Sequence, residues 1–400
     1  MQQYDVIIIG SGPCGLGVAK TLEEQNIHNY IILEREDHIG GIPFHCHHIT
    51  FGLISKYRPM TGDAYIKAIK KEIPEGKFRL STTAIKIEPH GVVHIHSKRG
   101  IEQISGKRVV VCTGVRERSR AQHLVSGMRP LGVFTTSALQ QFAYINHSLP
   151  FKKPVIVGSE HVAFSALMTL RDYGLKPVAM IESKDSIQTF AFLKYLGLIL
   201  GTSVKTGTIL HSINGIKKVE SVDLKDARGQ IHTVECDSVI FSGSFVSENA
   251  LLRDSHIHMT GPDTGPYISQ KYVTSDPYVY AGGNLLHPAD MGDRCYLEGI
   301  KVGSSIAESL LQGDVPKERE FIPITASGSI YHVQPSLIEK HTDQCLTNIR
   351  FKVKDNSKKC WATQNDKVIS SVNKSLFSHR FYTIDLKNID KKEKIDISAK

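Results

Sequence analysis

Apolar and polar positions alternate along the N-terminal part of the chain in a strand–helix–strand order. An apolar run at residues 4–9 leads directly into Gly10-Ser11-Gly12-Pro13-Cys14-Gly15, and a helical pattern follows. A second apolar run at residues 30–33 ends at Glu34, about 20 residues beyond the last glycine. The pattern predicts two parallel strands joined by a helix, with a G-x-G-x-x-G turn where the helix begins.

The three glycines of this turn have different physical roles. Gly10 allows the tight turn, Gly12 lets the backbone approach a pyrophosphate, and Gly15 lets the helix pack closely on the strand. The helix N-terminus then presents its N–H groups and the positive end of its dipole to the phosphates. Because Glu34 can accept hydrogen bonds from the ribose hydroxyls of an adenosine, the unit is predicted to bind a dinucleotide.

The same pattern occurs a second time. Residues 153–158 predict a strand entering a turn, residues 162–173 a helix, and residues 177–182 a strand that ends at Glu182. Residues 114–150, which are polar and glycine-spaced, are interpreted as a crossing between domains. Later, Val279-Tyr280-Ala281-Gly282-Gly283-Asn284 predicts a short strand with a Gly-Gly turn, and residues 298–311 predict a helix.

Beyond about residue 315 the pattern changes to short alternating segments. Residues 328–333 and 349–353 alternate between apolar and polar positions, which predicts strands of a small β domain. The last residues, 388–400, are expected to fray.

Two βαβ units followed by a late Ala-Gly-Gly-Asn turn resemble the two-dinucleotide flavoproteins of the pyridine nucleotide–disulfide oxidoreductase superfamily. Residues 40–48, 112–118 and 127–136 are similar to a branch related to the FAD subunits of hydrogen cyanide synthase, opine oxidase and dye-linked amino-acid dehydrogenases. The resemblance implies an α/β fold with two Rossmann-like dinucleotide-binding domains. It places a discontinuous FAD domain at residues 1–115 and 270–315, a linker and NAD(P)-type domain at 116–269, and a small β-rich C-terminal domain with a basic tail at 316–400.

The resemblance also implies roles for single residues. The glycine turn would hold the FAD pyrophosphate, Glu34 the adenosine ribose, and Ala84 would meet the adenine through its backbone. Asn284 stands where the family more often has Asp, and an ordinary turn residue is the alternative interpretation there. The full set of expected cofactor-binding residues is Gly10, Gly12, Pro13, Cys14, Gly15, Glu34, Gly41, Ala84, Thr113, Gly114, Gly283 and Asn284.

The residues required for disulfide reduction are missing from the expected places. Pro43 and His48 occupy the positions where related disulfide reductases carry two cysteines after a Gly-Gly pair, and the chain contains no C-x-x-C. Without a dithiol beside the flavin, electrons have no route to a disulfide substrate. A signature of flavin monooxygenases is also not visible.

The second nucleotide turn departs from the pattern at a critical position. Glu160 stands where the backbone should approach a pyrophosphate, and its carboxylate is bulky and like-charged with the phosphates. Either the second domain binds a nicotinamide dinucleotide weakly, or it remains only as a scaffold. If it binds one, Glu182 favours NAD over a coenzyme with a 2′-phosphate.

His45-Cys46-His47-His48 is the most unusual segment of the chain. Neighbouring residues of an extended segment point apart, so the four cannot all bind one metal ion, and no metal site is expected. By resemblance the loop runs beneath the flavin ring, where His47 or His48 could act as a base. A loop that only packs against the flavin is the alternative, and Cys46 is either a reactive or a packed thiol.

Charge and cysteine content indicate the cellular environment and possible partners of the protein, but say little about its activity. Residues 351–400 hold 12 Lys and Arg against 6 Asp and Glu, which is +6 of the net +9; this basic tail is either a solvated surface or a docking region. It lacks the interleaved aromatic residues of a nucleic-acid-binding module. Seven cysteines without close spacing favour a reducing cytoplasm, and no apolar stretch is long enough to span a bilayer.

These observations predict an FAD-dependent oxidoreductase that dehydrogenates a small amine, amino acid or hydroxy acid. Because the second domain is a weak candidate for nicotinamide binding and the chain lacks a redox dithiol, a partner protein or oxygen is expected to take the electrons. The partner would be a second flavoprotein or an iron–sulfur protein; any cluster would have to come from it, because Cys345 and Cys360 are too few for a cluster of this chain's own. The alternatives are an NADH-dependent flavoprotein reductase and a flavin-bearing relay component of a heteromeric dehydrogenase.

Overall fold

The computed structural model describes residues 1–189, 201–313, 320–340, 346–376, 381–386, 389–390 and 393–400. These residues group into two compact units. The first unit comprises residues 1–41, 66–114 and 247–400, and the second comprises residues 42–65 and 115–246.

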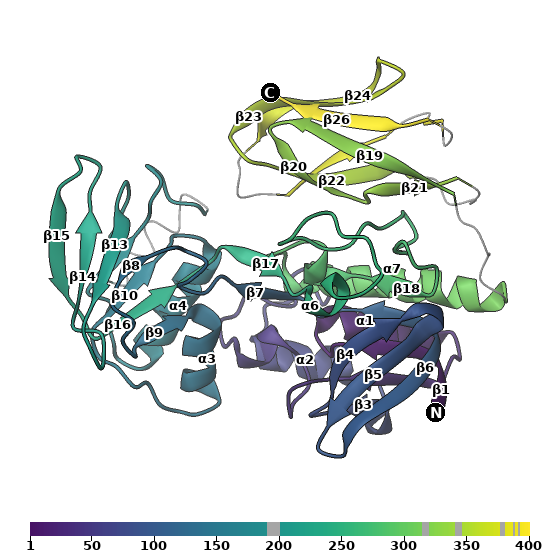
Figure 1. Ribbon diagram of the computed structural model, residues 1–400, viewed down its shortest axis with the longest axis horizontal. Coiled ribbons are helices and arrows are strands. Elements are labelled where there is room, and N and C mark those ends of the chain that lie inside the picture. The colour runs from purple at the N-terminus through teal and green to yellow at the C-terminus, as the bar shows by residue number, and fades with distance from the viewer. Residues whose placement is uncertain (190–200, 314–319, 341–345, 377–380, 387–388, 391–392) are drawn as a thin grey trace. The chain divides into compact units, whose positions relative to one another are not determined.

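The first unit is built on a largely parallel sheet. Its middle strands, β1 and β6, are buried along their C-terminal halves, and such continuous apolar runs are typical of strands covered on both faces. β18 extends the parallel part beside β6, and the β4–β5 hairpin continues β6 in antiparallel fashion (Figure 1). The strands are β1 (Gln2–Ile9), β2 (Tyr30–Leu33), β3 (Phe78–Arg79), β4 (Thr83–Glu88), β5 (Val92–Ser97), β6 (Gly100–Val111) and β18 (Val279–Ala281).

Glycines allow the two long helices of this unit to approach each other closely. A Cβ at Gly299 of α7 would overlap the carbonyl oxygen of Cys14 in α1, and one at Gly17 of α1 would overlap that of Tyr296 in α7. This approach fixes the start of α1 against the first half of α7. The helices of the unit are α1 (Pro13–Glu24), α6 (Ala250–Arg253), α7 (Gly292–Leu311) and the C-terminal part of α2 (Gly62–Lys70), with the 3₁₀ turns η2 (Glu75–Lys77), η3 (Pro89–Gly91) and η4 (Gly283–Leu285).

The second unit repeats the parallel βαβ arrangement on a smaller scale. β10 pairs in parallel with both β11 and β16, and β9 extends the sheet beyond β16. The chain enters through η1 (Ile42–His45), and β7 (Val115–Glu117) pairs with β17 (Phe245–Ser247). The parallel strands are β9 (Val133–Thr135), β10 (Pro154–Val157), β11 (Ala179–Ile181), β12 (Val204–Lys205) and β16 (Ser238–Phe241); the helices are α3 (Thr136–Tyr144) and α4 (His161–Asp172); a further sheet contains β8 (Ser126–Gly127), β13 (Ile209–Asn214), β14 (Ser221–Lys225) and β15 (Ile231–Glu235).

The C-terminal part of the first unit is all β. Two layers of strands enclose a core that includes Phe351, Cys360 and Ile397, each with no exposed surface. One sheet has the order β21 (Leu337–Glu339), β19 (Phe321–Gly328), β26 (Ile395–Ala399), β23 (Ser357–Gln364), β24 (Lys367–Leu376), and the other has the order β20 (Ile330–Gln334), β22 (Asn348–Val353), β25 (Tyr382–Asp385).

Three expectations about elements need correction. The passage at 114–150 is more than a crossing, because it supplies the edge strand β9 and the helix α3. The end of the chain does not fray, since β26 lies between β19 and β23 and buries Ile395 and Ile397. The last helix begins at Gly292, six residues before the predicted start, because Met291 occupies its N-cap. Among the described residues, no helix is long and apolar enough to cross a membrane.

Candidate cofactor and active site

The glycine turn after β1 leaves an open backbone surface at the start of α1. Gly10 has a φ of +105°, and a Cβ there would lie 2.5 Å from the carbonyl oxygen of Cys112. A Cβ at Gly15 would overlap the carbonyl oxygen of Gly10, so these two glycines are needed for packing. Gly12, the N-cap residue, differs, because nothing lies within 4 Å of a Cβ placed on it. Pro13 then begins the helix at a position where its missing N–H costs no hydrogen bond.

Glu34 is held at the end of β2 with hydrogen-bonding capacity remaining. Its Oε2 accepts from the N–H of Ser11 at 3.0 Å and from the Ser11 hydroxyl at 2.6 Å, and its Oε1 accepts from the N–H of Glu36 at 3.0 Å. An ionised carboxylate offers about four acceptor positions, so three hydrogen bonds leave room for one more donor. A ribose hydroxyl is a suitable donor for that position.

The ends of β6 and β18 bring further candidate residues to the same turn. The Thr113 hydroxyl donates to the carbonyl of Glu248 at 2.6 Å, and Gly114 has a φ of +75° with open space at its Cβ position. A Cβ at Gly283 would lie 2.7 Å from the Cβ of Cys14, and one at Gly41 would lie 3.3 Å from the Cα of Gly12. Ala84 lies apart from this cluster on β4, where it is half-buried.

Asn284 has a structural role in the turn that follows β18. Its side-chain oxygen accepts from the N–H of Asp290 at 2.9 Å, and its amide nitrogen donates to the carbonyl of Asp290 at 3.3 Å. These bonds close the loop between η4 and α7, which supports the interpretation of Asn284 as a turn residue.

Glu298 of α7 is a site residue that the sequence analysis missed. Its Oε2 accepts from the N–H of Gly283 at 2.7 Å, and its Oε1 lies 2.9 Å from Nε2 of His287. The Glu298 carboxylate therefore stabilises the Gly282-Gly283 turn through its hydrogen bond with the Gly283 N–H. The only sequence signal was a glutamate in a helix that follows a glycine turn.

Two cysteines that are far apart in sequence meet behind the glycine turn. The Cys112 thiol donates to Sγ of Cys14 at 3.4 Å, and both side chains are buried. This hydrogen bond and burial raise the pKa of Cys14 well above its ordinary value. A protonated, buried thiol is a poor nucleophile, so this environment disfavours a reactive thiolate at Cys14.

The residues of the first unit fit an FAD. The N-terminus of α1 is open at Gly12, and a phosphate there would meet helix N–H groups and no side chain of the turn. Glu34 retains an acceptor position for the ribose, and the turns at Gly114 and Gly283 both adopt positive φ.

The second unit has the same construction with one decisive change. Gly158 has a φ of +119°, and Glu182 accepts hydrogen bonds from the Ser159 hydroxyl at 2.6 Å and from the N–H of Lys184 at 3.0 Å. At the N-cap of α4, however, stands Glu160, and its carboxylate occupies the space that a Cβ at Gly243 would need. A carboxylate therefore stands at the helix N-terminus that would otherwise receive a pyrophosphate.

The histidine loop also belongs to the second unit. The Cys46 thiol donates to Oε1 of Gln140 at 3.3 Å, and burial, with a smaller contribution from Glu117, raises its pKa to about 12. This environment favours a packed thiol. His47 is exposed and stacks on Tyr144 with ring centroids 3.9 Å apart. His48 is half-buried, with Nδ1 2.7 Å from the Thr50 hydroxyl and its ring stacked on Phe51.

Glu117 of β7 is a buried carboxylate within the charged run Arg116-Glu117-Arg118. Its Oε2 accepts from the N–H of Ser137 at 2.8 Å, and burial raises its pKa above the ordinary value. The signal was the alternation along β7, in which Val115 and Glu117 point inward and Arg116 points outward.

Metal binding receives no support from clustering. In the part of the chain that the structure describes, no group of three or more His, Cys, Asp or Glu side chains could hold a metal ion. Cys360 is buried in the C-terminal core, and Cys345 lies outside the described residues.

Comparisons with known proteins identify related chains. A family model described as pyridine nucleotide-disulphide oxidoreductase matches residues 4–302. Thioredoxin reductase of Treponema pallidum (strain Nichols) is 24% identical over 290 residues, which are 70% of this chain and 89% of the relative. An opine oxidase component from Rhizobium meliloti (strain 1021) is 25% identical over 187 residues, which are 46% of this chain but only 39% of the relative.

Among solved structures, L-proline dehydrogenase from P. horikoshii has a similar fold. The TM-score is 0.58 at 19% identity, covering 78% of this chain and 57% of that chain. At this identity the similarity concerns the fold alone. The match covers 39% of the opine oxidase component and 57% of the proline dehydrogenase chain, which is less than two thirds of either.

Proposed function

This chain belongs to the pyridine nucleotide-disulphide oxidoreductase family of FAD-dependent enzymes, and we propose that it dehydrogenates a small amine, amino acid or hydroxy acid. The names of two similar proteins, an opine oxidase component and L-proline dehydrogenase, agree with this substrate class. FAD, when bound, supplies the acceptor for a hydride from the substrate carbon.

The observation that carries the proposal is the contrast between the two nucleotide turns. Gly12 leaves the start of α1 open, whereas Glu160 places a carboxylate at the start of α4. The chain therefore favours a bound dinucleotide in the first unit over one in the second. Electrons are then expected to enter from an organic substrate and not from a nicotinamide coenzyme.

The residues proposed to hold FAD are those of the first unit described above. The backbone N–H groups at the start of α1, where Pro13 has none, would hold the pyrophosphate. The Glu34 carboxylate would accept a hydrogen bond from the ribose. Cys14 and Glu298 would not contact the cofactor but would support the turn at Gly283, Cys14 by packing against it and Glu298 by accepting a hydrogen bond from its N–H. The wider set also includes Gly41, Ala84, Thr113 and Gly114.

His48 is the residue we propose as the base that takes a proton from the substrate. Burial lowers the pKa of His48 below its ordinary value, so its imidazole is neutral and able to accept a proton at pH 7. In the tautomer in which Nδ1–H of His48 donates to the Thr50 hydroxyl oxygen, Nε2 carries no hydrogen and is the atom that would receive the proton.

Disulfide reduction, which the name of the T. pallidum relative suggests, is not proposed for this chain. Cys46 and Cys14 both have raised pKa values and lie buried, and neither belongs to a C-x-x-C pair. A thiolate is needed to attack a disulfide, and these environments disfavour it.

The test is a screen of amines, amino acids and hydroxy acids for flavin reduction without oxygen. The holoenzyme should lose its yellow absorbance with at least one of these compounds and keep it in buffer alone. If none of the three classes reduces the flavin, the proposed substrate class is wrong.

A second candidate function is NADH-dependent flavin reduction. It is favoured by Glu182, which keeps the hydrogen bonds expected of a ribose-binding carboxylate. An anaerobic titration separates the two functions, because rapid bleaching of the flavin at one equivalent of NADH would support this candidate. Co-purification with a second flavoprotein or an iron–sulfur protein, and no turnover by the isolated chain, would instead indicate a relay component of a larger enzyme.

A further inference from the structure

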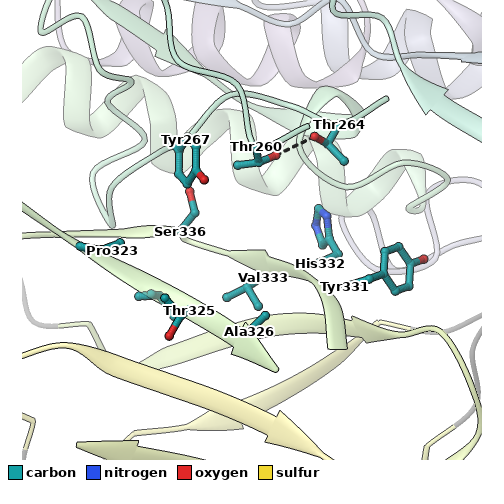
Figure 2. A pocket seen from close by; sticks show the side chains of 11 residues that line it. Thr260, Thr264, Tyr267, Pro323, Thr325, Ala326, Tyr331, His332, Val333 and Ser336 are labelled. Carbon is teal, nitrogen blue, oxygen red and sulfur yellow. Dashed lines mark hydrogen bonds between the residues drawn. The ribbon is translucent and has the colours of Figure 1, made fainter. Parts of the chain in front are cut away.

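The cavity beside the C-terminal strands of the first unit leaves little for a ligand to bind. In its wall the Thr260 hydroxyl donates to the Thr264 hydroxyl at 2.7 Å (Figure 2), and the Ser336 hydroxyl donates to the carbonyl of Ile268 at 3.4 Å. These hydroxyl groups are therefore already engaged within the chain. The surface of the second unit, in contrast, exposes several large apolar side chains close together.

Two segments of the second unit lie side by side at the edge of the sheet that contains β8 and β13. The N–H of Met128 donates to the carbonyl of Ile213 at 2.8 Å, and the N–H of Leu131 donates to the carbonyl of Lys217 at 3.1 Å. The stretch after β8 therefore runs alongside the turn between β13 and β14. This stretch belongs to the motif at residues 127–136, which supplies no residue to the proposed flavin site.

Large aliphatic side chains of these two segments are exposed to solvent. Leu131 and Ile216 are each 80% exposed, and Met128 is 51% exposed. A single exposed apolar residue is ordinary, but a group of them rimmed by charged side chains is typical of a protein-binding surface. We name this group, with the basic residues between its members, the β8 surface: Met128, Arg129, Leu131, Ile216, Lys217 and Lys218.

The charged side chains of the β8 surface are all positive. Arg129, Lys217 and Lys218 are exposed, and none of them forms an ion pair with a residue that the structure describes. Burial, and next the charge of Arg129, lower the pKa of Arg120, so Arg120 adds a further positive charge beside the surface. Glu220 is an exposed acid two residues beyond Lys218, and the net charge of these five side chains is +3.

We propose that the β8 surface binds an acidic protein chain, with apolar side chains of the partner on Leu131 and Ile216 and its carboxylates on the three basic side chains. An apolar centre with a polar rim is the usual construction of a protein–protein interface, and complementary charges steer the docking. A second copy of the chain is a poor occupant, because each copy carries a net charge of +9. A nucleic acid is also a poor occupant, because the β8 surface has no aromatic side chain on which a base could stack.

This proposal gives the second unit a task that does not need a bound dinucleotide. The β8 surface belongs to the sheet of β8, β13, β14 and β15, whereas Glu160 stands at the start of α4. A partner can therefore dock whether or not the nucleotide turn of the unit is closed. The proposal is also independent of the flavin site, so its failure would leave the proposed dehydrogenase function untouched.

Fluorescence anisotropy of a labelled peptide with four Glu-Glu-Leu repeats, titrated with the holoprotein, tests the proposal. This peptide should bind about tenfold or more tightly than its Gln-Gln-Leu and Glu-Glu-Ser analogues, and added salt should weaken binding by screening the charges. Carbodiimide coupling, which joins carboxylates to amines, should attach the peptide at Lys217 or Lys218, as read by mass spectrometry. Equal binding of the three peptides, coupling mainly within residues 351–400, or tighter binding of anionic lipid vesicles would each overturn the proposal.

A pair of charge reversals locates the basic part of the site. Lys217→Glu combined with Lys218→Glu should weaken binding of the Glu-Glu-Leu peptide about tenfold or more. Lys98→Glu combined with Arg99→Glu is the matched control, because it makes the same change of charge at two adjacent exposed residues between β5 and β6. An equal loss in both double variants would mean that net charge alone attracts the peptide, and the proposal would be wrong.

A second pair of variants tests the apolar part. Leu131→Ser combined with Ile216→Ser should weaken binding of the same peptide about tenfold, whereas Ile101→Ser, at a side chain 67% exposed on β6, should not change it. All of these side chains are exposed, so the variants are expected to fold, and an unchanged melting temperature checks this. Unchanged peptide binding in the Leu131 and Ile216 variant, or a dimer of the wild-type chain that this variant dissociates, would overturn the proposal.

Discussion

Gly12 and Glu160 have nearly the same backbone conformation, but only Glu160 has a side chain there. Both are N-cap residues, with φ and ψ of −68° and 179° at Gly12 and of −74° and 174° at Glu160. The backbone at Gly12 is therefore one that a glutamate adopts without strain. We propose that the residue at this one position determines whether each turn admits a pyrophosphate.

Gly12→Glu is accordingly expected to remove bound FAD without unfolding the protein. The new carboxylate would occupy the place proposed for the phosphates, and its negative charge would repel theirs. The Kd for FAD should rise by at least tenfold, which corresponds to about 1.4 kcal/mol of lost affinity, and flavin absorbance per purified chain should fall with it. Gly76→Glu is the matched control, because a Cβ at Gly76 also meets open space. Normal flavin content in Gly12→Glu would contradict the placement of the pyrophosphate.

His48→Ala is expected to slow substrate-driven flavin reduction by about 10²–10⁴-fold while FAD stays bound, as for loss of a general base. The pKa of His48 is lowered by burial, so its neutral form is the reactive one over a wider range than for a free histidine. The wild-type reduction rate should stay level from pH 8 to about 6.5 and fall only below the lowered pKa. Stopped-flow reduction across this pH range is the measurement. His96→Ala should leave the rate unchanged, and an unchanged rate in His48→Ala would return the loop to a packing role.

At the scale of elements, the start of α4 decides whether the second unit can take up a nicotinamide dinucleotide. Gly158, Ser159 and Glu182 keep the geometry of a nucleotide turn, and Glu160 is the feature that opposes binding. Glu160→Gly should therefore strengthen NADH binding about tenfold or more, measured by NADH fluorescence, if like-charge repulsion is what opposes the phosphates. Glu235→Ala, at an exposed carboxylate of β15 in the same unit, should have no effect. If Glu160→Gly binds NADH no better, the closure of this turn has another cause.

β26 is expected to be essential to the C-terminal sheet. Ile397→Ala should lower the free energy of unfolding by about 2–5 kcal/mol, because it leaves a cavity in the C-terminal core into which Ile397 packs. Trp361, the single tryptophan of the chain, lies opposite Ser398 of β26 and reports this sheet directly in urea unfolding. Ile101→Ala, at a side chain 67% exposed, should change the same transition by less than about 0.5 kcal/mol. A similarly small loss in Ile397→Ala would mean that the end of the chain frays after all.

Local pattern was sufficient to predict some elements and insufficient for others, for a physical reason. β1, α1 and β2 were predictable because their apolar spacing and glycines lie within about thirty residues. The hydrogen bond between Cys14 and Cys112 spans 98 residues, and no sequence pattern indicates it. β26 was misjudged because lysines dominate the sequence before it, while its burial depends on two strands distant in sequence.

At the scale of the whole molecule, the C-terminal strands are bonded to two other parts of the first unit, the segment at Ile268 and the loop between η4 and α7. Ser336 exchanges hydrogen bonds with the backbone of Ile268, and Arg350 of β22 pairs with Asp290 at 2.6 Å. Asp290 in turn is held by Asn284, so the β-rich part is connected to the loop between η4 and α7. This connection joins residues 60 positions apart in sequence, and no local sequence pattern indicates it.

The assignment of one dinucleotide to the first unit leads to a prediction for the whole chain. FAD added to flavin-free protein should slow amide hydrogen exchange in residues 10–24, around α1, because ligand at 100 times its Kd adds about 2.7 kcal/mol to the opening free energy. Exchange in residues 158–172, at the start of α4, should stay unchanged with FAD and with equimolar NADH, since Glu160 already occupies that turn. Gly12→Glu should abolish the FAD effect and leave the exchange of α4 as it was. Protection of the α4 segment by FAD, with none at α1, would reverse the roles of the two units and with them the proposed path of the electrons.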